Sequence, residues 1–235
     1  MQRNSMTGIA AIAFAILFNI PYALLASIYD YPDVLRRPAG EALDLFAAGG
    51  STLIFAWHGF ALAALALIPM SIALSVTPSR IANQPGLTIG AAIAGSLAGF
   101  AQAVGLSRWV FVVPGLARSH ASPDASPTAL VAAERAFELL NAYGGVAIGE
   151  HLGQLLTALF VCLLAAIQSW ERQHVTSMIG FVAAAMIALG TGEGLAIAID
   201  SSGEMFALTT IVGFFGLTFW LIATGIGLVR LPAAD

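Results

Sequence analysis

Seven side chains that carry charge or form hydrogen bonds interrupt otherwise apolar stretches of this sequence. Carboxylates bind cations or move protons, arginine binds anionic groups, and histidine changes its charge near neutral pH. A charged side chain at the centre of a membrane helix costs about 2.5–3.5 kcal/mol, so it is usually paired or functional. The candidate ligand-binding cluster is therefore His58, Gln102, Arg108, Glu150, His151, Gln154 and Glu193.

Four of these residues are predicted to share one depth in the membrane. His58, Arg108, Glu150 and Glu193 each lie a few residues from the same end of their apolar stretches. A rise of about 1.5 Å per helical residue places all four roughly 8–10 Å below one membrane face. Scattered polar residues would not share a depth, so we predict one polar cluster in the outer half of the bilayer.

Within this cluster, Arg108 is expected to pair with Glu150, Glu193 or both, because an unpaired guanidinium at that depth is costly. One arginine and two glutamates leave one negative charge. A protonated His58 or His151, or a bound cation, would offset it. Glu150 lies on the same helix face as Gln154, four residues further on.

Three interpretations of the cluster remain open at this point. It could be a structural ion pair that fixes helix register, a pocket for a small molecule or ion, or a metal or haem site. For a metal, the weak candidate ligands are His58, His151, Glu150 and Glu193, and the two histidines could flank a haem. No HExxH, nucleophile-elbow or phosphate-loop motif is present, so catalytic residues and cofactors stay unknown and enzyme activity stays open.

The composition indicates an integral membrane protein. Hydrophobic residues make up 59% of the 235 residues and charged residues only 9%, with a mean hydropathy of +0.88. A soluble domain carries roughly 25% charged residues. The net charge is −4 and lysine is absent, so nucleic acid is an unsuitable partner. Cys162 is the only cysteine, which excludes an intramolecular disulfide and a cysteine-based zinc site, and it is expected to pack in the interior.

Six stretches are long and apolar enough to cross a bilayer, which takes about 20 residues each. The expected fold is an all-α membrane bundle forming one domain over 1–235, with one or two further helices at the membrane interface. The interfacial candidates are Pro38–Ala48 and Pro127–Tyr143, the latter capped by Ser126. An ordinary surface helix packed on the protein is the alternative. The expected spans are 6–28, 51–76, 87–113, 144–167, 177–199 and 205–229.

Glycines recur every fourth residue in two of these stretches. Such stripes let helices approach closely, either within the bundle or against a second copy or another membrane protein. Three further glycines surround Glu193 and favour local unwinding of the helix there. The stripes are Gly95 with Gly99, and Gly145 with Gly149 and Gly153.

Several other residues are expected to play no part in a site. His120 and His174 are predicted to be solvated in connections. The four tryptophans are interpreted as interface anchors or packing residues: Trp57, Trp109, Trp170 and Trp220. An even number of spans places both termini on one side. Short arginine-bearing connections on that side favour a cytoplasmic location, in a cell membrane.

Three short motifs resemble a family of small bacterial multi-span membrane proteins known only as a domain of unknown function. The resemblance would cover nearly the whole chain. It implies a bacterial inner-membrane protein and supplies no activity. The motifs are Tyr31-Pro32-Asp33-Val34-Leu35, Arg108-Trp109-Val110 with Pro114, and Gly149-Glu150-His151-Leu152-Gly153-Gln154.

Overall fold

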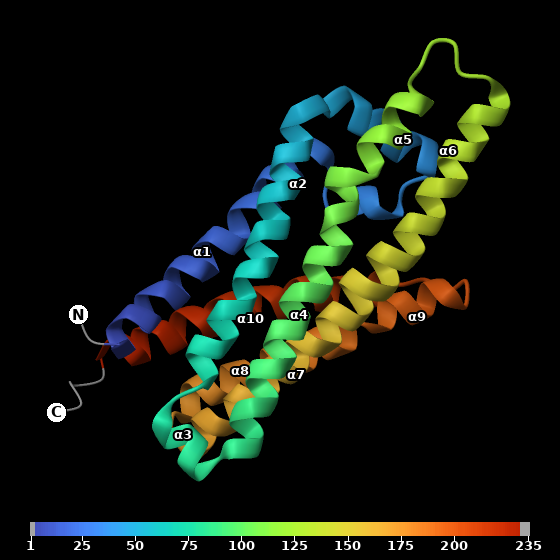
Figure 1. Ribbon diagram of the computed structural model, residues 1–235. Helices are drawn as coiled ribbons and strands as arrows, with labels where there is room; N and C mark the ends of the chain where they lie inside the picture. The colour runs from blue at the N-terminus through green and yellow to red at the C-terminus, as the bar shows by residue number, and fades with distance from the viewer. Residues whose placement is uncertain (1–2, 231–235) are drawn as a thin grey trace.

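The computed structural model describes residues 3–230, and all regular structure within them is helical (Figure 1). The helices run in chain order as α1 (Arg3–Tyr29), η1 (Asp33–Arg36), α2 (Ala39–Ser75), α3 (Pro78–Asn83), α4 (Pro85–Phe111), α5 (Val113–His120), α6 (Pro127–Leu140), η2 (Asn141–Leu152), α7 (Gly153–Trp170), α8 (His174–Gly190), α9 (Gly192–Ala198) and α10 (Glu204–Arg230). η1 is a short 3₁₀-helix and η2 a π-helix.

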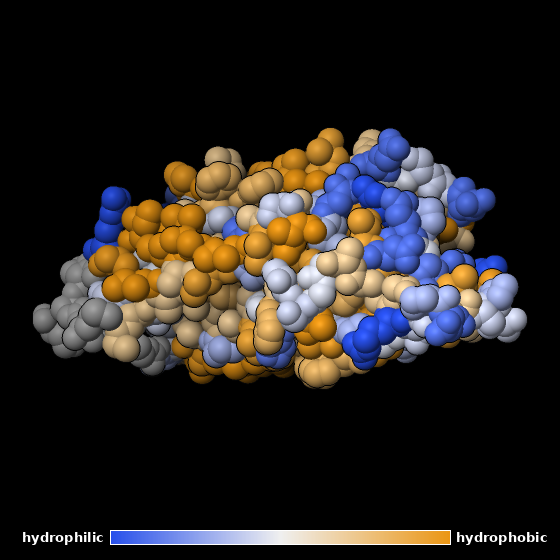
Figure 2. All heavy atoms as spheres, turned by 90° about the horizontal axis from the view of Figure 1, so that it is seen from above, coloured by the Kyte–Doolittle hydropathy of each residue, from blue (hydrophilic) through white to orange (hydrophobic). Residues whose placement is uncertain are grey.

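Six continuous helical stretches are long and apolar enough to cross a membrane, which confirms the predicted helical membrane bundle. Large apolar side chains cover the outside, for example Phe55 and Phe111, which are 74% and 75% exposed. Figure 2 shows this apolar surface along most of the molecule, with hydrophilic atoms gathered toward one end. The crossing stretches are Asn4–Tyr29, Ala39–Ser75, Pro85–His120, Pro127–Trp170, His174–Ala198 and Glu204–Arg230.

The two predicted extra helices exist, but both are extensions of membrane-length helices. The first forms the start of α2 and joins the rest at a kink at Gly50, whose φ of 56° and ψ of −143° suit glycine alone. The second is α6, which continues through η2 into α7. Ser126 caps α6 by accepting a hydrogen bond from the Ala129 amide at 3.2 Å. Both helices bury apolar faces against the protein, and an interfacial position stays a prediction.

The buried apolar residues form two clusters at opposite ends of the bundle. One is centred on Phe160, Leu164 and Trp220. The other gathers Tyr29, Trp57 and other residues of α1, α2, α4, α5 and α6. α2 packs on α4, α4 packs on η2 and α7, and α10 packs on α8 and α1. The helices that bear the candidate residues thus surround the region between the clusters.

The glycine stripes bring helices of this chain together. An added Cβ on Gly149 would lie 3.1 Å from the Gly105 Cα, so η2 and α4 touch backbone to backbone. Gly95 and Gly99 face α2, and Gly153 faces Gln102 in α4. These glycines are therefore occupied by contacts within this chain, and contact with a second copy or another membrane protein stays a prediction.

Candidate functional site

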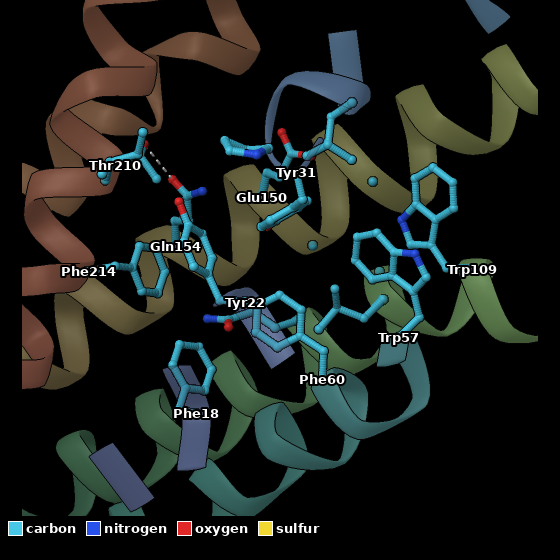
Figure 3. Close-up of a pocket in the computed structure, with 18 of the residues that line it drawn as sticks. Phe18, Tyr22, Tyr31, Trp57, Phe60, Trp109, Glu150, Gln154, Thr210 and Phe214 are labelled. Atoms are coloured by element: carbon cyan, nitrogen blue, oxygen red, sulfur yellow. Dashed lines mark hydrogen bonds between the residues drawn. The ribbon is translucent and has the colours of Figure 1, made fainter. Parts of the chain in front are cut away.

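A cavity of about 140 Å³ lies between the helices. A single water needs roughly 10–15 Å³ on the same measure, so a small organic molecule or several waters would fit. The walls come from six helices and from the connection between α1 and α2 (Figure 3). The lining residues are Phe18, Asn19, Tyr22, Tyr31, Pro32, Leu35, Trp57, Phe60, Gln102, Gly105, Leu106, Arg108, Trp109, Gly145, Gly149, Glu150, Gln154, Thr210, Ile211, Phe214 and Phe215.

Aromatic rings form much of the cavity wall. Trp57 and Trp109 stack with centroids 4.8 Å apart and planes inclined by 9°, and both are fully buried. Tyr31 meets Trp57 edge-on at 5.4 Å. In Figure 3 this tryptophan pair lies at one side of the cavity and Phe214 at the other. Trp57 and Trp109 are thus buried wall residues rather than interface anchors.

Arg36, and not Arg108, pairs with the two glutamates of the predicted cluster. Its Nη2 donates to Glu150 Oε2 at 2.6 Å, and its Nε donates to Glu193 Oε1 at 2.9 Å. Burial alone would lower the pKa of the Arg36 guanidinium, but the two carboxylates outweigh burial and raise it. The predicted Arg108–glutamate pair is therefore wrong, since a cation from the α1–α2 connection takes that place.

Arg108 instead bonds to uncharged oxygens. Its side chain is 6% exposed, with Nη1 donating to Gly105 O at 2.5 Å and Nη2 to Asn141 Oδ1 at 3.0 Å. Asn141 Nδ2 donates in turn to Leu35 O at 3.2 Å. Arg108 thereby links α4, η2 and the α1–α2 connection. It remains near Glu150 without a direct bond.

Four of the seven predicted residues line the cavity: Gln102, Arg108, Glu150 and Gln154. Gln102 Nε2 donates to Thr157 Oγ1 at 2.7 Å, and Gln154 Oε1 accepts from Thr210 Oγ1 at 3.4 Å. These four residues come from two membrane-length stretches, Pro85–His120 and Pro127–Trp170, so two of the four spans expected to meet bring their predicted residues together.

The other three predicted residues lie outside the cavity wall. His58 is exposed on the outside of α2, one position from the inward-facing Trp57, so its predicted place in the cluster is wrong. His151 hydrogen-bonds through Nδ1 to Thr191 O at 3.0 Å. Glu193 lies just behind the wall in its pair with Arg36. The helix breaks at Thr191 between α8 and α9, where the glycines beside Glu193 predicted it.

The arrangement offers no closely spaced metal ligands. Within residues 3–230, no three histidine, cysteine or carboxylate side chains come together in a way that could hold a metal ion. His58 and His151 also cannot flank a haem, because His58 points away from the bundle. Cys162, expected to pack inside, is exposed on α7.

η2 shapes one wall of the cavity. π-helices are rare and usually occur as single turns at functional sites, whereas this one covers Asn141–Leu152. Each turn of a π-helix takes more residues than an α-helical turn, which changes the direction in which side chains point. Gly145, Gly149 and Glu150 of η2 all line the cavity. The wider turns thus help to place the Glu150 carboxylate beside Gly145 and Gly149, which carry no side chains.

Besides Arg108 and Glu150, the cavity wall holds uncharged polar side chains. Tyr22 and Tyr31 contribute phenol hydroxyls. Gln102 and Gln154 contribute amides. Among the described residues, Gln102 Oε1 and Gln154 Nε2 have no hydrogen-bond partner in the protein. Burial, and to a smaller extent the Glu150 carboxylate, raises the pKa of the Tyr31 phenol well above its usual value. Tyr31 therefore keeps its proton and acts as a neutral hydrogen-bonding group.

Four further polar atoms in the wall residues are buried and unpartnered within residues 3–230. Three are donors: Trp57 Nε1, Trp109 Nε1 and Arg108 Nε. The fourth, Glu150 Oε1, is an acceptor. Each such atom costs roughly 1–3 kcal/mol relative to its hydration in the unfolded chain. Most buried polar groups in folded proteins are satisfied, so four in one wall call for an explanation.

His120 is also placed differently from its prediction. It ends α5, and its side chain is only 10% exposed. Its ring nitrogens lie 2.8 Å from Asp44 Oδ1 and 3.2 Å from Glu134 Oε1. His120 therefore joins α2, α5 and α6 at the hydrophilic end and is not a solvated loop residue.

Arg36 and the aromatic wall residues were not among the site residues predicted from the sequence. Arg36 directly follows the Tyr31–Leu35 motif, and Tyr31, Pro32 and Leu35 of that motif line the cavity. A polar motif at the end of a span, followed by a cation, was the available signal. The aromatic residues gave none, because their spacing does not differ from that of packing residues.

A family model matches residues 6–225, nearly the whole described chain. The chain belongs to the family DUF4386, a domain of unknown function. This confirms the resemblance seen in the three motifs, each of which contributes residues to the cavity wall, for example Tyr31, Arg108 and Glu150. No curated protein and no solved structure gives a significant match.

Proposed function

We propose that this multi-span membrane protein binds a small molecule in the cavity between α1, α2, α4, η2, α7 and α10, in the outer half of the bilayer. The observation that carries the proposal is a lined hollow whose walls hold unpartnered hydrogen-bonding groups. A cluster that served only to fix helix register would satisfy its own polar groups. Ligand pockets typically combine apolar and aromatic walls with a few polar groups, as this cavity does.

The charges support binding over a purely structural role in a second way. Arg36 already pairs with both Glu150 and Glu193, so neither carboxylate depends on the cavity for a charged partner. The phenols and amides that line the cavity take no part in these ion pairs. They offer contacts that the helices do not use themselves.

A small neutral thiol reagent tests whether the cavity admits a guest. Thr210 lines the cavity from α10, so Thr210→Cys in a Cys162→Ser background places one thiol inside. Methyl methanethiosulfonate should modify this variant in membranes. It should not modify a matched Ala98→Cys variant, because Ala98 is fully buried in the packed core.

A cavity-filling substitution supplies the specific control. Leu106→Trp extends a lining residue of α4 into the space, and Ile211→Phe does so from α10. Each should slow modification of the Thr210→Cys variant while the protein stays monodisperse by gel filtration. If Thr210→Cys reacts no faster than Ala98→Cys, the cavity is closed to small molecules and the binding function is wrong.

A further inference from the structure

The cavity wall holds charged residues beside uncharged hydrogen-bonding groups. The charged residues in and behind the wall, Arg36, Arg108, Glu150 and Glu193, are two cations and two anions. They sum to zero. Because this set is already neutral, a guest with a net charge would give the site a net charge, and the guest would lose its hydration on leaving water.

The open groups favour a guest that both donates and accepts hydrogen bonds. Phenol hydroxyls and amides, such as Tyr22, Tyr31 and Gln154, do both or present either role. The buried atoms behind them include donors on Trp57, Trp109 and Arg108 and an acceptor on Glu150. A hydroxyl group on the guest can accept a hydrogen bond from the Gln154 amide N–H and donate one to a phenol oxygen at the same time.

The walls also specify the body of the guest. Phe18, Phe60 and Phe214 add further aromatic faces to the stacked tryptophans, from three different helices (Figure 3). Flat aromatic faces pack best against another flat ring, and such pairs are worth about 0.5–1.5 kcal/mol beyond area burial. A planar apolar ring therefore fits these walls better than a compact polar molecule such as a sugar.

From these contacts we infer that the cavity takes an uncharged ring-bearing amphiphile whose polar end is a hydroxyl-type group, both donor and acceptor. This inference rests on the proposed binding function and narrows it to one ligand class. The ring lies among the aromatic side chains, and the polar end meets the tyrosine and glutamine groups near Glu150.

A matched set of naphthalenes separates the charge classes on one ring. The set comprises 2-naphthol (neutral, donor and acceptor), 2-methoxynaphthalene (acceptor only), 2-naphthoate (anion) and 2-naphthyltrimethylammonium (cation). Each is used at neutral pH to protect the Thr210→Cys variant from methyl methanethiosulfonate. The concentration for half-protection is compared after correction for partitioning into lipid. 2-Naphthol should protect at roughly tenfold lower concentration than any other member, equivalent to about 1.4 kcal/mol.

Variants of the polar end add a second readout. Gln154→Leu and Tyr22→Phe each remove a hydrogen-bonding group from the wall. They should weaken 2-naphthol protection toward the level of 2-methoxynaphthalene, while the protection given by 2-methoxynaphthalene itself stays constant. The lipid-facing Phe55→Leu variant should leave both unchanged, because Phe55 is 74% exposed on α2.

The outcomes distinguish this inference from the proposed function beneath it. If the anion or the cation protects better than 2-naphthol, the cavity binds guests but the neutral class is wrong. If the donor-free ether protects equally well, the hydroxyl requirement is wrong. If the reagent reaches the Thr210→Cys thiol and no naphthalene protects it, the ring-bearing class is wrong. An unreactive thiol overturns the binding function itself.

Discussion

Arg36 pairs with two carboxylates that lie on different helices. Glu150 belongs to η2 and Glu193 to α9, so one guanidinium ties both to the α1–α2 connection. The Arg36 side chain is only 32% exposed. Two planar donors on one fixed fork hold both acceptors at once, which a lysine ammonium does less well.

Replacing Arg36 should destabilise the fold. Arg36→Met leaves Glu150 and Glu193 partly buried and unpaired, and we expect a loss of roughly 1–3 kcal/mol, between the values for exposed and buried pairs. Thermal unfolding in detergent measures it. Arg135→Met is the matched control, because Arg135 is 77% exposed and pairs only with the nearby Glu138. Equal unfolding temperatures for the two variants would contradict the bridging role.

Tyr31 should make stability fall at alkaline pH. Its pKa is raised in the folded protein, so above about pH 10 the unfolded chain loses this proton while the folded protein keeps it. The stabilisation is complete below pH 10 and is lost as pH rises toward the folded value. Tyr31→Phe should flatten this decline in a series of unfolding measurements. An unchanged slope between wild type and variant would show that Tyr31 ionises normally.

At the scale of elements, contact between η2 and α4 positions the cavity wall. Gly105 and Gly149 let the two backbones touch, and Arg108 spans from α4 to Asn141 just above this contact. The π-helical turns of η2 place Glu150 beside this contact. Backbone contact of this kind transmits any added volume directly to the helix axes, since interiors are close-packed.

Gly149→Ala should separate these two helices. The new Cβ would lie 3.1 Å from the Gly105 Cα, where no flexible side chain can yield. Overpacking of this type costs about 1–3 kcal/mol. Gly227→Ala is the control, because nothing lies within 4 Å of its added Cβ in α10. We expect a lower unfolding temperature for the first variant and no loss for the second, and equal stability would refute close contact.

For the molecule as a whole, six crossings place the ends of the chain together. The start of α1 packs on the end of α10 at Gly8 and Gly225, and Figure 1 shows the blue and red helix ends side by side. We expect both termini to lie on one side of the membrane, and we expect that side to be the cytoplasm.

Reporter fusions to the C-terminus test this orientation in a bacterial host. A green fluorescent protein fusion should fluoresce, and an alkaline phosphatase fusion should be inactive, because the phosphatase needs an oxidising compartment. A fusion of the same two reporters after Asp124, in the connection between α5 and α6, should give the reverse pattern. An active phosphatase fusion at the C-terminus would show that the orientation is the opposite of the one expected.

The bundle could be predicted from sequence because a bilayer admits few solutions. Apolar stretches of sufficient length must become helices, since backbone groups find no water there. The depth argument correctly selected Arg108 and Glu150, and Gln102 and Gln154 were found because they are polar residues within apolar stretches. The rotation of each helix about its own axis could not be predicted in this way. Successive residues are about 100° apart around a helix, so Trp57 faces inward and His58 outward.

Arg36 escaped prediction for a different physical reason. It lies in a connection, where no periodicity constrains the backbone, and its partners are more than 100 residues away in sequence. Only the tertiary fold brings the connection over the cavity. The same holds for the aromatic walls, which are assembled from residues of α1, α2, α4 and α10.

The α1–α2 connection contributes Tyr31, Pro32 and Leu35 to the cavity and is fastened by the pairs of Arg36. Dissolved ions screen such partly exposed pairs, with a Debye length near 10 Å at about 0.1 M salt. A guest leaving toward water must loosen this fastening, whereas one leaving sideways between helices need not. If the residence time of the bound guest shortens as ionic strength rises, the guest leaves toward water. If the residence time does not change with salt, the guest leaves between the helices into the lipid.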